Sequence, residues 1–207
     1  MGKTMRVTIT SLKGGVGKTV SSIHIAACLA MRGKTALIDG DMNQSSLDWA
    51  RAGDGLPFEV VAINDARKYL TSHKPDHIVV DTAAAPSDDS LKILARDTDL
   101  LILPTKPDAI SLRALIKTIK ILKDAKANNF RVLLTMVSPS RKVGEMATES
   151  LSNQGIPIFK NQIRLYSAYE IAATNGCLVH QARDSNGRKV SNSGIAWSDY
   201  LAVGNEL

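Results

Sequence analysis

Aromatic residues and cysteines are both scarce in this chain, and each scarcity excludes a class of protein. Phe, Trp and Tyr together make up 4% of the 207 residues, so a nucleic-acid reader built on stacked aromatic platforms is not expected. The two cysteines, Cys28 and Cys177, are far apart and form no C-x-x-C pair, which indicates neither a zinc site nor a disulfide framework. We therefore expect a protein of the reducing cytoplasm.

Long hydrophobic runs are also missing. No stretch approaches the ~20 consecutive apolar residues that a membrane-spanning helix needs. The remaining composition is ordinary for a globular protein, with 44% hydrophobic and 22% charged residues, and the length favours one domain over residues 1–207. The charges are not balanced: the formal net charge is +6, which is consistent with a polyanionic partner.

Short apolar runs alternate with segments of helical pattern. The runs are nearly continuous, as in parallel strands that helices cover on both faces; they span residues 6–10, 35–38, 58–62, 77–80, 100–103, 131–137 and 157–159. The helical segments span residues 21–31, 87–95, 111–128 and 144–154, with a closing helix at 195–207. This alternation predicts a single α/β domain with a doubly wound, mostly parallel sheet and helices on both faces.

The segment SLKGGVGKTV, residues 11–20, follows the first apolar run and opens the first helical segment. Strand, glycine-rich turn and helix form the context of a phosphate-binding loop. Lys18 would reach the β- and γ-phosphates, and the Thr19 hydroxyl would ligate Mg²⁺. The alternative is a tight glycine turn without a ligand. Backbone N–H groups of such a loop cradle the phosphates, here along Gly14, Gly15, Val16, Gly17 and Val20.

The loop departs from the usual pattern at its start. G-x-x-x-x-G-K-[ST] requires glycine five residues before Gly17, where this chain has Leu12. The version K-G-G-x-G-K-T resembles the deviant Walker A motif of the ParA/MinD family of ATPases. The resemblance implies a P-loop domain that binds ATP and Mg²⁺. It also implies that Lys13, the early signature lysine, crosses a dimer interface to the phosphates of the partner's nucleotide. Taken outside the motif, Lys13 would be read as a solvated loop lysine.

Two aspartates follow the second apolar run, in the segment ALIDGDMNQSS. They lie at the carboxyl end of an expected strand, where ligand sites of α/β folds are found. The ParA/MinD family usually has D-x-D-P-Q here, and Met42 and Asn43 take the place of the single proline. The resemblance implies that Asp41 orients the attacking water beside the metal and that Asp39 supports the site. Both aspartates could instead cap the next helix.

The segment HIVVDTAAAPS carries Asp81 at the end of another apolar run. It matches a Walker B strand, whose aspartate holds Mg²⁺, here through a water. The expected metal site is therefore Thr19, Asp41 and Asp81, and the expected catalytic residues are Lys13, Lys18 and Asp41. No glutamate base is evident, so we expect slow intrinsic hydrolysis that a partner accelerates by ordering the loop around Asp41.

The segment LLILPTKPD bears on whether the nucleotide carries adenine or guanine, because its T-K-x-D pattern ends at Asp108. This pattern resembles the guanine-reading motif of signal-recognition-type GTPases. Those GTPases have D-x-x-G after the Walker B strand, whereas this chain has Ala84, and they lack the early lysine. We therefore expect adenine, near Met136 and Ser138, with GTP as the alternative.

Positive charge gathers on the helical segment SLRALIKTIKILKDAKANN, where most cations recur three or four residues apart. Such a stripe can neutralise several phosphates without reading bases, so the expected partner is non-specific DNA. A solvated amphipathic helix is the alternative. The later segment IFKNQIRLYSAYEIAATNG resembles a stretch of ParA proteins, which implies a DNA contact by Arg164. The DNA-binding candidates are Arg164, Lys117, Lys120, Arg188 and Lys189.

The two ends of the sequence bear on the choice of partners. No helix-turn-helix precedes the phosphate loop, so binding to a specific operator is not expected. The closing segment IAWSDYLAVGNEL carries no cation, so no membrane anchor of the MinD kind is expected.

The resemblance implies a weak ATPase that forms a homodimer with ATP and acts in the cytoplasm on the nucleoid. It would partition or position a plasmid, a chromosome or a protein organelle. A small cargo-adaptor or centromere-binding protein would stimulate hydrolysis. The alternatives are a metabolic ATP-dependent enzyme of the same fold and a GTPase.

The substitution Lys18→Ala should abolish nucleotide binding, because the β- and γ-phosphates lose the cation that neutralises them inside the loop. Titration of a fluorescent ATP analogue against wild type and variant measures the effect. Unchanged affinity in the variant would mean that the glycine-rich turn is not a phosphate site.

Overall fold

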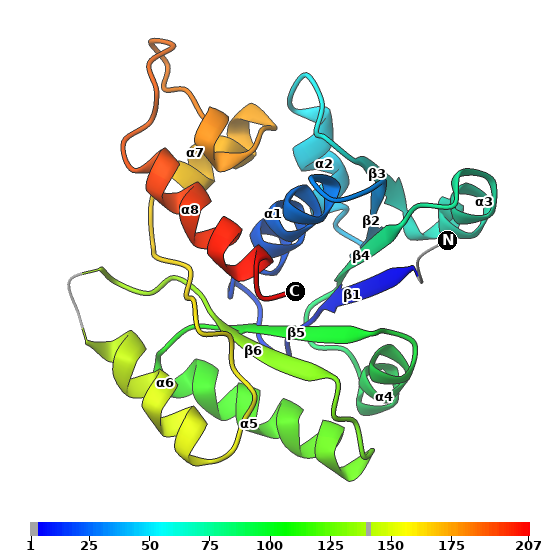
Figure 1. Cartoon of the computed structure of the whole chain (residues 1–207), viewed down its shortest axis with the longest axis vertical. Coiled ribbons are helices and arrows are strands. Elements are labelled where there is room, and N and C mark those ends of the chain that lie inside the picture. Colours follow the sequence, from blue (N-terminus) through cyan, green and yellow to red (C-terminus); the bar gives the residue numbers. More distant parts are fainter. Residues whose placement is uncertain (1–3, 140–141) are drawn as a thin grey trace.

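A computed structural model of the chain describes residues 4–139 and 142–207. Its centre is a six-stranded sheet in which all neighbours are parallel, in the order β3-β2-β4-β1-β5-β6 (Figure 1). The strands are β1 Met5–Ile9, β2 Thr35–Gly40, β3 Glu59–Ala62, β4 His77–Thr82, β5 Leu100–Thr105 and β6 Phe130–Leu134.

Helices cover both faces of this sheet, which confirms the predicted fold class. Helices α1, α2, α7 and α8 gather on one side, and α4, α5 and α6 lie on the other (Figure 1). The helices are α1 Lys18–Ala30, α2 Ser45–Arg51, α3 Ile63–His73, α4 Asp88–Arg96, α5 Ala109–Asp124, α6 Val143–Asn153, α7 Ala168–Asn175 and α8 Ser193–Gly204, with a 3₁₀ turn at Val179–Gln181.

The run at residues 157–159, which the sequence predicts as a strand, is not one. Val132 N–H donates to Pro157 O at 2.8 Å and Phe159 N–H donates to Val132 O at 2.9 Å, which makes one isolated bridge beside β6. Proline has no N–H to extend such a ladder. The segment therefore runs along β6 without becoming a seventh strand.

Helix α1 lies in the largest core, between the sheet and α8. Its side chains are apolar on nearly all sides, as expected of a helix that is enclosed by neighbours; those buried include Ile23, Ile25 and Leu29. This enclosure fixes the helix that follows the phosphate loop, so the loop has a rigid base.

One polar ring is buried in this core. His24 is 0% exposed, its Nδ1 lies 2.7 Å from Val20 O, and its Nε2 accepts the Val179 N–H at 3.1 Å. Because Nε2 is an acceptor, Nδ1 carries the proton and donates to Val20 O. The ring stacks on Tyr200 with centroids 4.7 Å apart. Burial lowers the pKa of His24 to about 4, so the imidazole is neutral.

Folding stability should fall as the pH drops from about 6.5 toward 4. The unfolded chain binds a proton at His24 near pH 6.5, while the folded chain resists it down to about 4. The contribution of His24 is therefore complete above pH 6.5, and about 3 kcal/mol is lost across the window, at ~1.4 kcal/mol per pKa unit. Urea denaturation at stepped pH values measures it. His24→Gln should show a shallower pH dependence than wild type; equal slopes would refute this assignment.

Candidate nucleotide-binding site

The phosphate loop spans the turn between β1 and α1. Gly17 has a left-handed backbone, with φ 81°, that favours glycine. Val16 is buried, and its carbonyl accepts the Thr135 hydroxyl at 2.8 Å. This bond ties the loop to the end of β6, while a Cβ at Gly14 or Gly15 would meet no atom within 4 Å. The loop is thus anchored at one side and open at the other.

Lys18, the first residue of α1, is a buried cation. Its exposed fraction is 8%, and among residues 4–139 and 142–207 its ammonium has no hydrogen-bond or ion-pair partner. A buried charge is costly unless it is paired. The side chain therefore fits an anionic ligand, such as the phosphates of a nucleotide.

Asp81 lies near the carboxyl end of β4, and it is 0% exposed. Its carboxylate accepts three hydroxyl bonds: Thr19 Oγ1 at 2.8 Å, Ser22 Oγ at 3.0 Å and Ser46 Oγ at 2.9 Å. Burial raises the pKa of Asp81, the hydroxyls oppose this, and Asp39 adds to the rise. A divalent cation would relieve that burial cost, so Thr19 and Asp81 suit Mg²⁺ shared with phosphates.

Asp39 is buried as well, on the strand next to Asp81. Its two oxygens accept the backbone N–H groups of Asp41 at 3.0 Å and of Leu47 at 2.9 Å. Asp39 therefore shapes the loop before α2 and caps the start of that helix, as the capping alternative proposed. Asp41 instead accepts the N–H of Asn43 within its own turn, at 3.0 Å. Its role toward water and metal stays a prediction.

Ser22 and Ser46 were missed from the sequence. Ser22 lies one helical turn after Thr19, so the spacing T-x-x-S on α1 was a usable signal. Ser46 meets Asp81 only because the chain folds back after β2, and no local pattern marks that contact.

Helix α2 is joined to the segment after α7. Trp49 Nε1 donates to Cys177 O at 3.1 Å. Gly53 lies so close to Gly176 that a Cβ there would be 2.4 Å from the Gly176 carbonyl oxygen. The two segments are packed backbone against backbone.

Lys13 is not free in solvent. Its ammonium donates to Ser111 Oγ at 2.8 Å and lies 3.7 Å from Asp108 Oδ1. Asp108 is the N-cap of α5 and accepts the Ser111 N–H at 2.9 Å. Partial burial opposes the shift, but the bonds from Ser111 and the charge of Lys13 lower the pKa of Asp108. Asp108 thus serves as a cap and counter-ion, which argues against a guanine-reading role.

A cavity of about 190 Å³ adjoins the loop at Gly17 and Val20. Thr135, Met136 and several apolar or aromatic side chains of the Ile163–Tyr169 region line it, together with Tyr200. An apolar cavity next to a phosphate loop suits a nucleoside. Of the two expected neighbours of the base, Met136 lines this cavity and Ser138 lines a neighbouring cavity of about 250 Å³; contact with a base stays a prediction.

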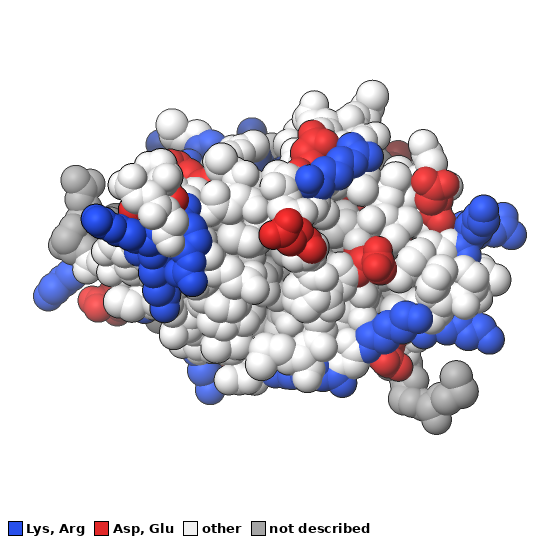
Figure 2. Space-filling model, turned by 90° about the horizontal axis from the view of Figure 1, so that it is seen from above, with Lys and Arg blue, Asp and Glu red and all other residues white. Residues whose placement is uncertain are grey.

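The structure does not bring the DNA-binding candidates together. Arg164 lines the cavity of about 190 Å³, and its guanidinium pairs with Asp199, with Nε 3.0 Å from Oδ2. Lys117 and Lys120 are exposed on α5, whereas Arg188 and Lys189 are exposed on the loop before α8, at the opposite end of the molecule (Figure 1). Seen from above, Lys and Arg side chains lie mainly toward the rim of the molecule, and few charges of either sign lie near its centre (Figure 2).

No helix in the described part of the chain has the length and apolar character needed to cross a bilayer. Nor do its residues form a cluster of three or more His, Cys, Asp or Glu side chains arranged to hold a metal.

Comparison with known proteins agrees with this geometry. Residues 7–179 match the CobQ/CobB/MinD/ParA nucleotide binding domain. The chain is 35% identical to the maintenance of carboxysome distribution protein A of Gloeobacter kilaueensis, over 97% of this chain and 93% of that protein. It is 25% identical to protein ParA of Rhizobium radiobacter, over 87% of each. The MinD cell division protein of Aquifex aeolicus has the same fold, with a TM-score of 0.75 and 18% identity over 98% of this chain and 95% of that one.

Replacing Ser46 by Ala should weaken Mg²⁺-dependent ATP binding by about 10-fold, the scale seen when a partner of a metal ligand is removed. The variant leaves Asp81 with one hydroxyl fewer and frees α2 from β4. Titrating Mg²⁺ in the presence of a fluorescent ATP analogue measures it. Ser45→Ala, at the neighbouring position, is the control and should match wild type. Equal Mg²⁺ affinity in both variants would contradict the role of Ser46.

Proposed function

Because the chain belongs to the CobQ/CobB/MinD/ParA nucleotide-binding domain family, we propose that it is an ATPase that dimerises with ATP, binds DNA non-specifically and positions a cargo. The observation that carries this proposal is the buried Lys18, whose ammonium has no partner among the described residues, next in sequence to Thr19, which bonds Asp81. A buried cation next to a hydroxyl–carboxylate pair is complementary to a Mg²⁺-bound triphosphate. When bound, Mg²⁺ neutralises phosphate charge.

Dimerisation brings Lys13 to the nucleotide of a second copy. Three large apolar side chains support a contact on this edge of the sheet, since they lie exposed in segments after β2, β5 and β6: Met42 at 95%, Ile110 at 67% and Leu165 at 54%. Large apolar side chains that are this exposed favour burial by a partner. Lys13 exchanges its contacts with Ser111 and Asp108 for phosphate oxygens when the dimer forms.

Hydrolysis depends on the loop from Asp41 to Gln44. Asp41 orients water there, and Lys18 and Lys13 stabilise charge on the transferring phosphoryl group. A partner protein that orders this loop raises the rate. The partner and DNA respond to the nucleotide because they bind the ATP dimer and the free subunit with different affinity.

The cargo is best assigned as a protein organelle. The carboxysome distribution relative is more similar in sequence than protein ParA, at 35% against 25% identity. A plasmid or chromosome is the second choice. In either case the protein acts in the cytoplasm on nucleoid DNA, and the stimulating partner is a small cargo-adaptor protein.

A metabolic ATP-dependent enzyme of the same fold is the competing function. It would show turnover that depends on a small substrate and not on DNA. ATP turnover measured with and without DNA separates the two functions. The positioning ATPase should respond to DNA, whereas the metabolic enzyme should not.

Lys13→Ala should weaken ATP-dependent dimerisation by about 10-fold, or ~1.4 kcal/mol, since it removes the net gain made when the cation leaves Ser111 and Asp108 for the more highly charged phosphates. ATP binding to the single subunit should persist. Light scattering with ATP measures the dimer, and Lys68→Ala on α3 is the matched control. A dimer as stable in Lys13→Ala as in the control would reject the proposed role.

DNA binding should require ATP and fall steeply with salt. Removing one cation that binds a phosphate should reduce the salt slope by about 1. Lys117→Ala with Lys120→Ala, and separately Arg188→Ala with Lys189→Ala, show by fluorescence anisotropy which surface binds. Lys92→Ala, whose side chain pairs with Asp89, is the control. If neither double variant differs from it, these four cations do not bind DNA.

A further inference from the structure

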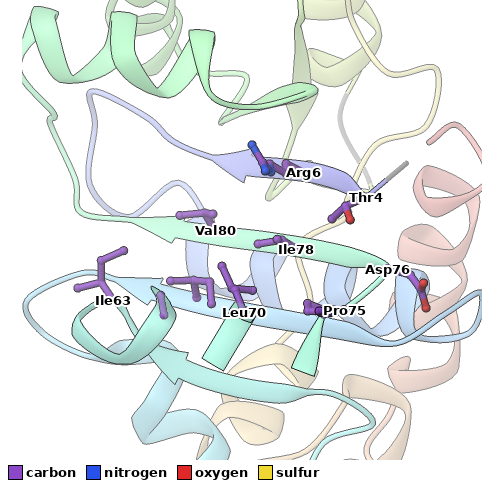
Figure 3. Close-up of a pocket in the computed structure, with 11 residues that line it drawn as sticks. Thr4, Arg6, Ile63, Leu70, Pro75, Asp76, Ile78 and Val80 are labelled. Atoms are coloured by element: carbon purple, nitrogen blue, oxygen red, sulfur yellow. The ribbon is translucent and has the colours of Figure 1, made fainter. Parts of the chain in front are cut away.

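A groove lies on the side of the sheet away from the phosphate loop. Helix α3 packs against β2 and β3, and α4 packs against β5, which leaves β4 and β1 open between them. The groove holds about 530 Å³ and runs along the strands, with Ile63 and Val80 toward one end and Thr4 and Asp76 toward the other (Figure 3). Its lining is Thr4, Arg6, Ile38, Ile63, Ala66, Leu70, Lys74, Pro75, Asp76, Ile78 and Val80.

The floor and one wall of the groove are apolar. Ile38 and Ile78 form part of a small core under α3, and Leu70 and Val80 pack against it only partly buried. Ile63, in the first turn of α3, is 55% exposed. A parallel sheet normally has both faces covered by helices. The groove is therefore a place where a helix would be expected to cover the strands.

Two cations border the groove toward the end where Thr4 and Asp76 lie. The side chains of Arg6 and Lys74 have no hydrogen-bond or ion-pair partner in the described part of the chain. Asp97 lies near enough to Arg6 that this cation contributes to lowering its pKa, but Asp97 is already hydrogen-bonded to Arg96 at 2.9 Å. Asp76 accepts the Lys34 N–H at 2.9 Å. Because this bond comes from a backbone N–H, it leaves the charge of Asp76 in place; of the three charged residues that line the groove, two are cations and one is an anion, so the lining carries a net positive charge.

The groove and the nucleotide site lie back to back. Successive side chains of a strand point to opposite faces. Ile38 therefore faces the groove while its neighbour Asp39 faces the site, and Val80 and Asp81 are divided in the same way. An occupant of the groove would press on the strands that carry both carboxylates.

We propose that this groove receives an amphipathic helical segment of a partner protein, apolar on one face and acidic at the end that meets Arg6 and Lys74. Insertion of an amphipathic helix into an apolar groove is a common recognition mode, and here it completes the helical layer. A second copy of this chain is a poorer occupant because its proposed contact lies at the carboxyl edge of the sheet. The assignment of this segment to the hydrolysis-stimulating partner rests on the proposed function.

Two synthetic helical peptides of about 16 residues, long enough to show helicity, test the docking without nucleotide. Both carry Leu at i, i+3, i+4 and i+7; one has Glu residues at one end and the other has Lys at the same positions. Fluorescence anisotropy should show the Glu peptide binding at least ~10-fold more tightly than the Lys peptide. Amide shifts on Ile63–His73 and His77–Thr82 should map the contact.

Two variants with matched controls make the test specific. Ile63→Asp and Lys74→Glu should each weaken binding of the Glu peptide by at least ~10-fold. Ile195→Asp, a 43% exposed isoleucine in the first turn of α8, and Lys68→Glu, elsewhere on α3, should bind as wild type does. Ile63 and Lys74 are exposed, so these variants should fold.

Three results would overturn the inference. They are equal binding of both peptides, equal weakening by the control variants, and nucleotide-free self-association that Ile63→Asp abolishes, which would make a second copy the occupant. Light scattering with ATP on the same samples tests the proposed function separately. Intact ATP-dependent dimers without peptide docking would reject only the groove.

Discussion

The constraint on which the site depends is the burial of the Asp81 carboxylate. A carboxylate that is removed from water needs hydrogen bonds or a cation to remain in place. Hydroxyls from α1 and α2 supply the bonds, and these bonds draw the phosphate-loop helix and the loop around Asp41 onto one strand end. Asp39, which lies opposite Asp81 across β2 and β4, adds like charge and raises the pKa of Asp81 further.

Charge at the other end of the loop is balanced differently. Lys18 is enclosed without a counter-ion in the described part of the chain, whereas Lys13 has found one on its own chain, at the N-cap of α5. The first arrangement makes nucleotide binding favourable for a single subunit. In the proposed dimer, Lys13 must leave the oxygens of Ser111 and Asp108 for phosphate oxygens. Its net contribution to the free energy of dimerisation is therefore the difference between these two charge-assisted contacts. In the proposed cycle, subunit association is therefore sensitive to which phosphates are present.

Local sequence patterns predicted the fold class, the strand, glycine turn and helix around residues 11–20, and the Asp81 strand, because these elements are contiguous in the chain. They did not predict α2, α3 or α7. These helices are short or largely polar, and tertiary packing stabilises them more than propensity does. The Ser46–Asp81 and Arg164–Asp199 hydrogen bonds could not be predicted from local sequence patterns either, since each joins residues that are 35 positions apart in the chain. The cations proposed to bind DNA were found one by one, but their separation onto α5 and a distant loop needed the three-dimensional arrangement.

The backbone contact between Gly53 and Gly176 leaves no room for either segment to slide past the other. Helix α7 contributes Tyr169, Glu170 and Ala173 to the wall of the cavity beside the phosphate loop, and α2 follows the loop that carries Asp41. A displacement of one helix should therefore move the other as well, because packed protein interiors are nearly incompressible. The cavity wall on α7 and the loop that leads into α2 should therefore move as one unit, so that a change of cavity shape reaches the carboxyl end of β2.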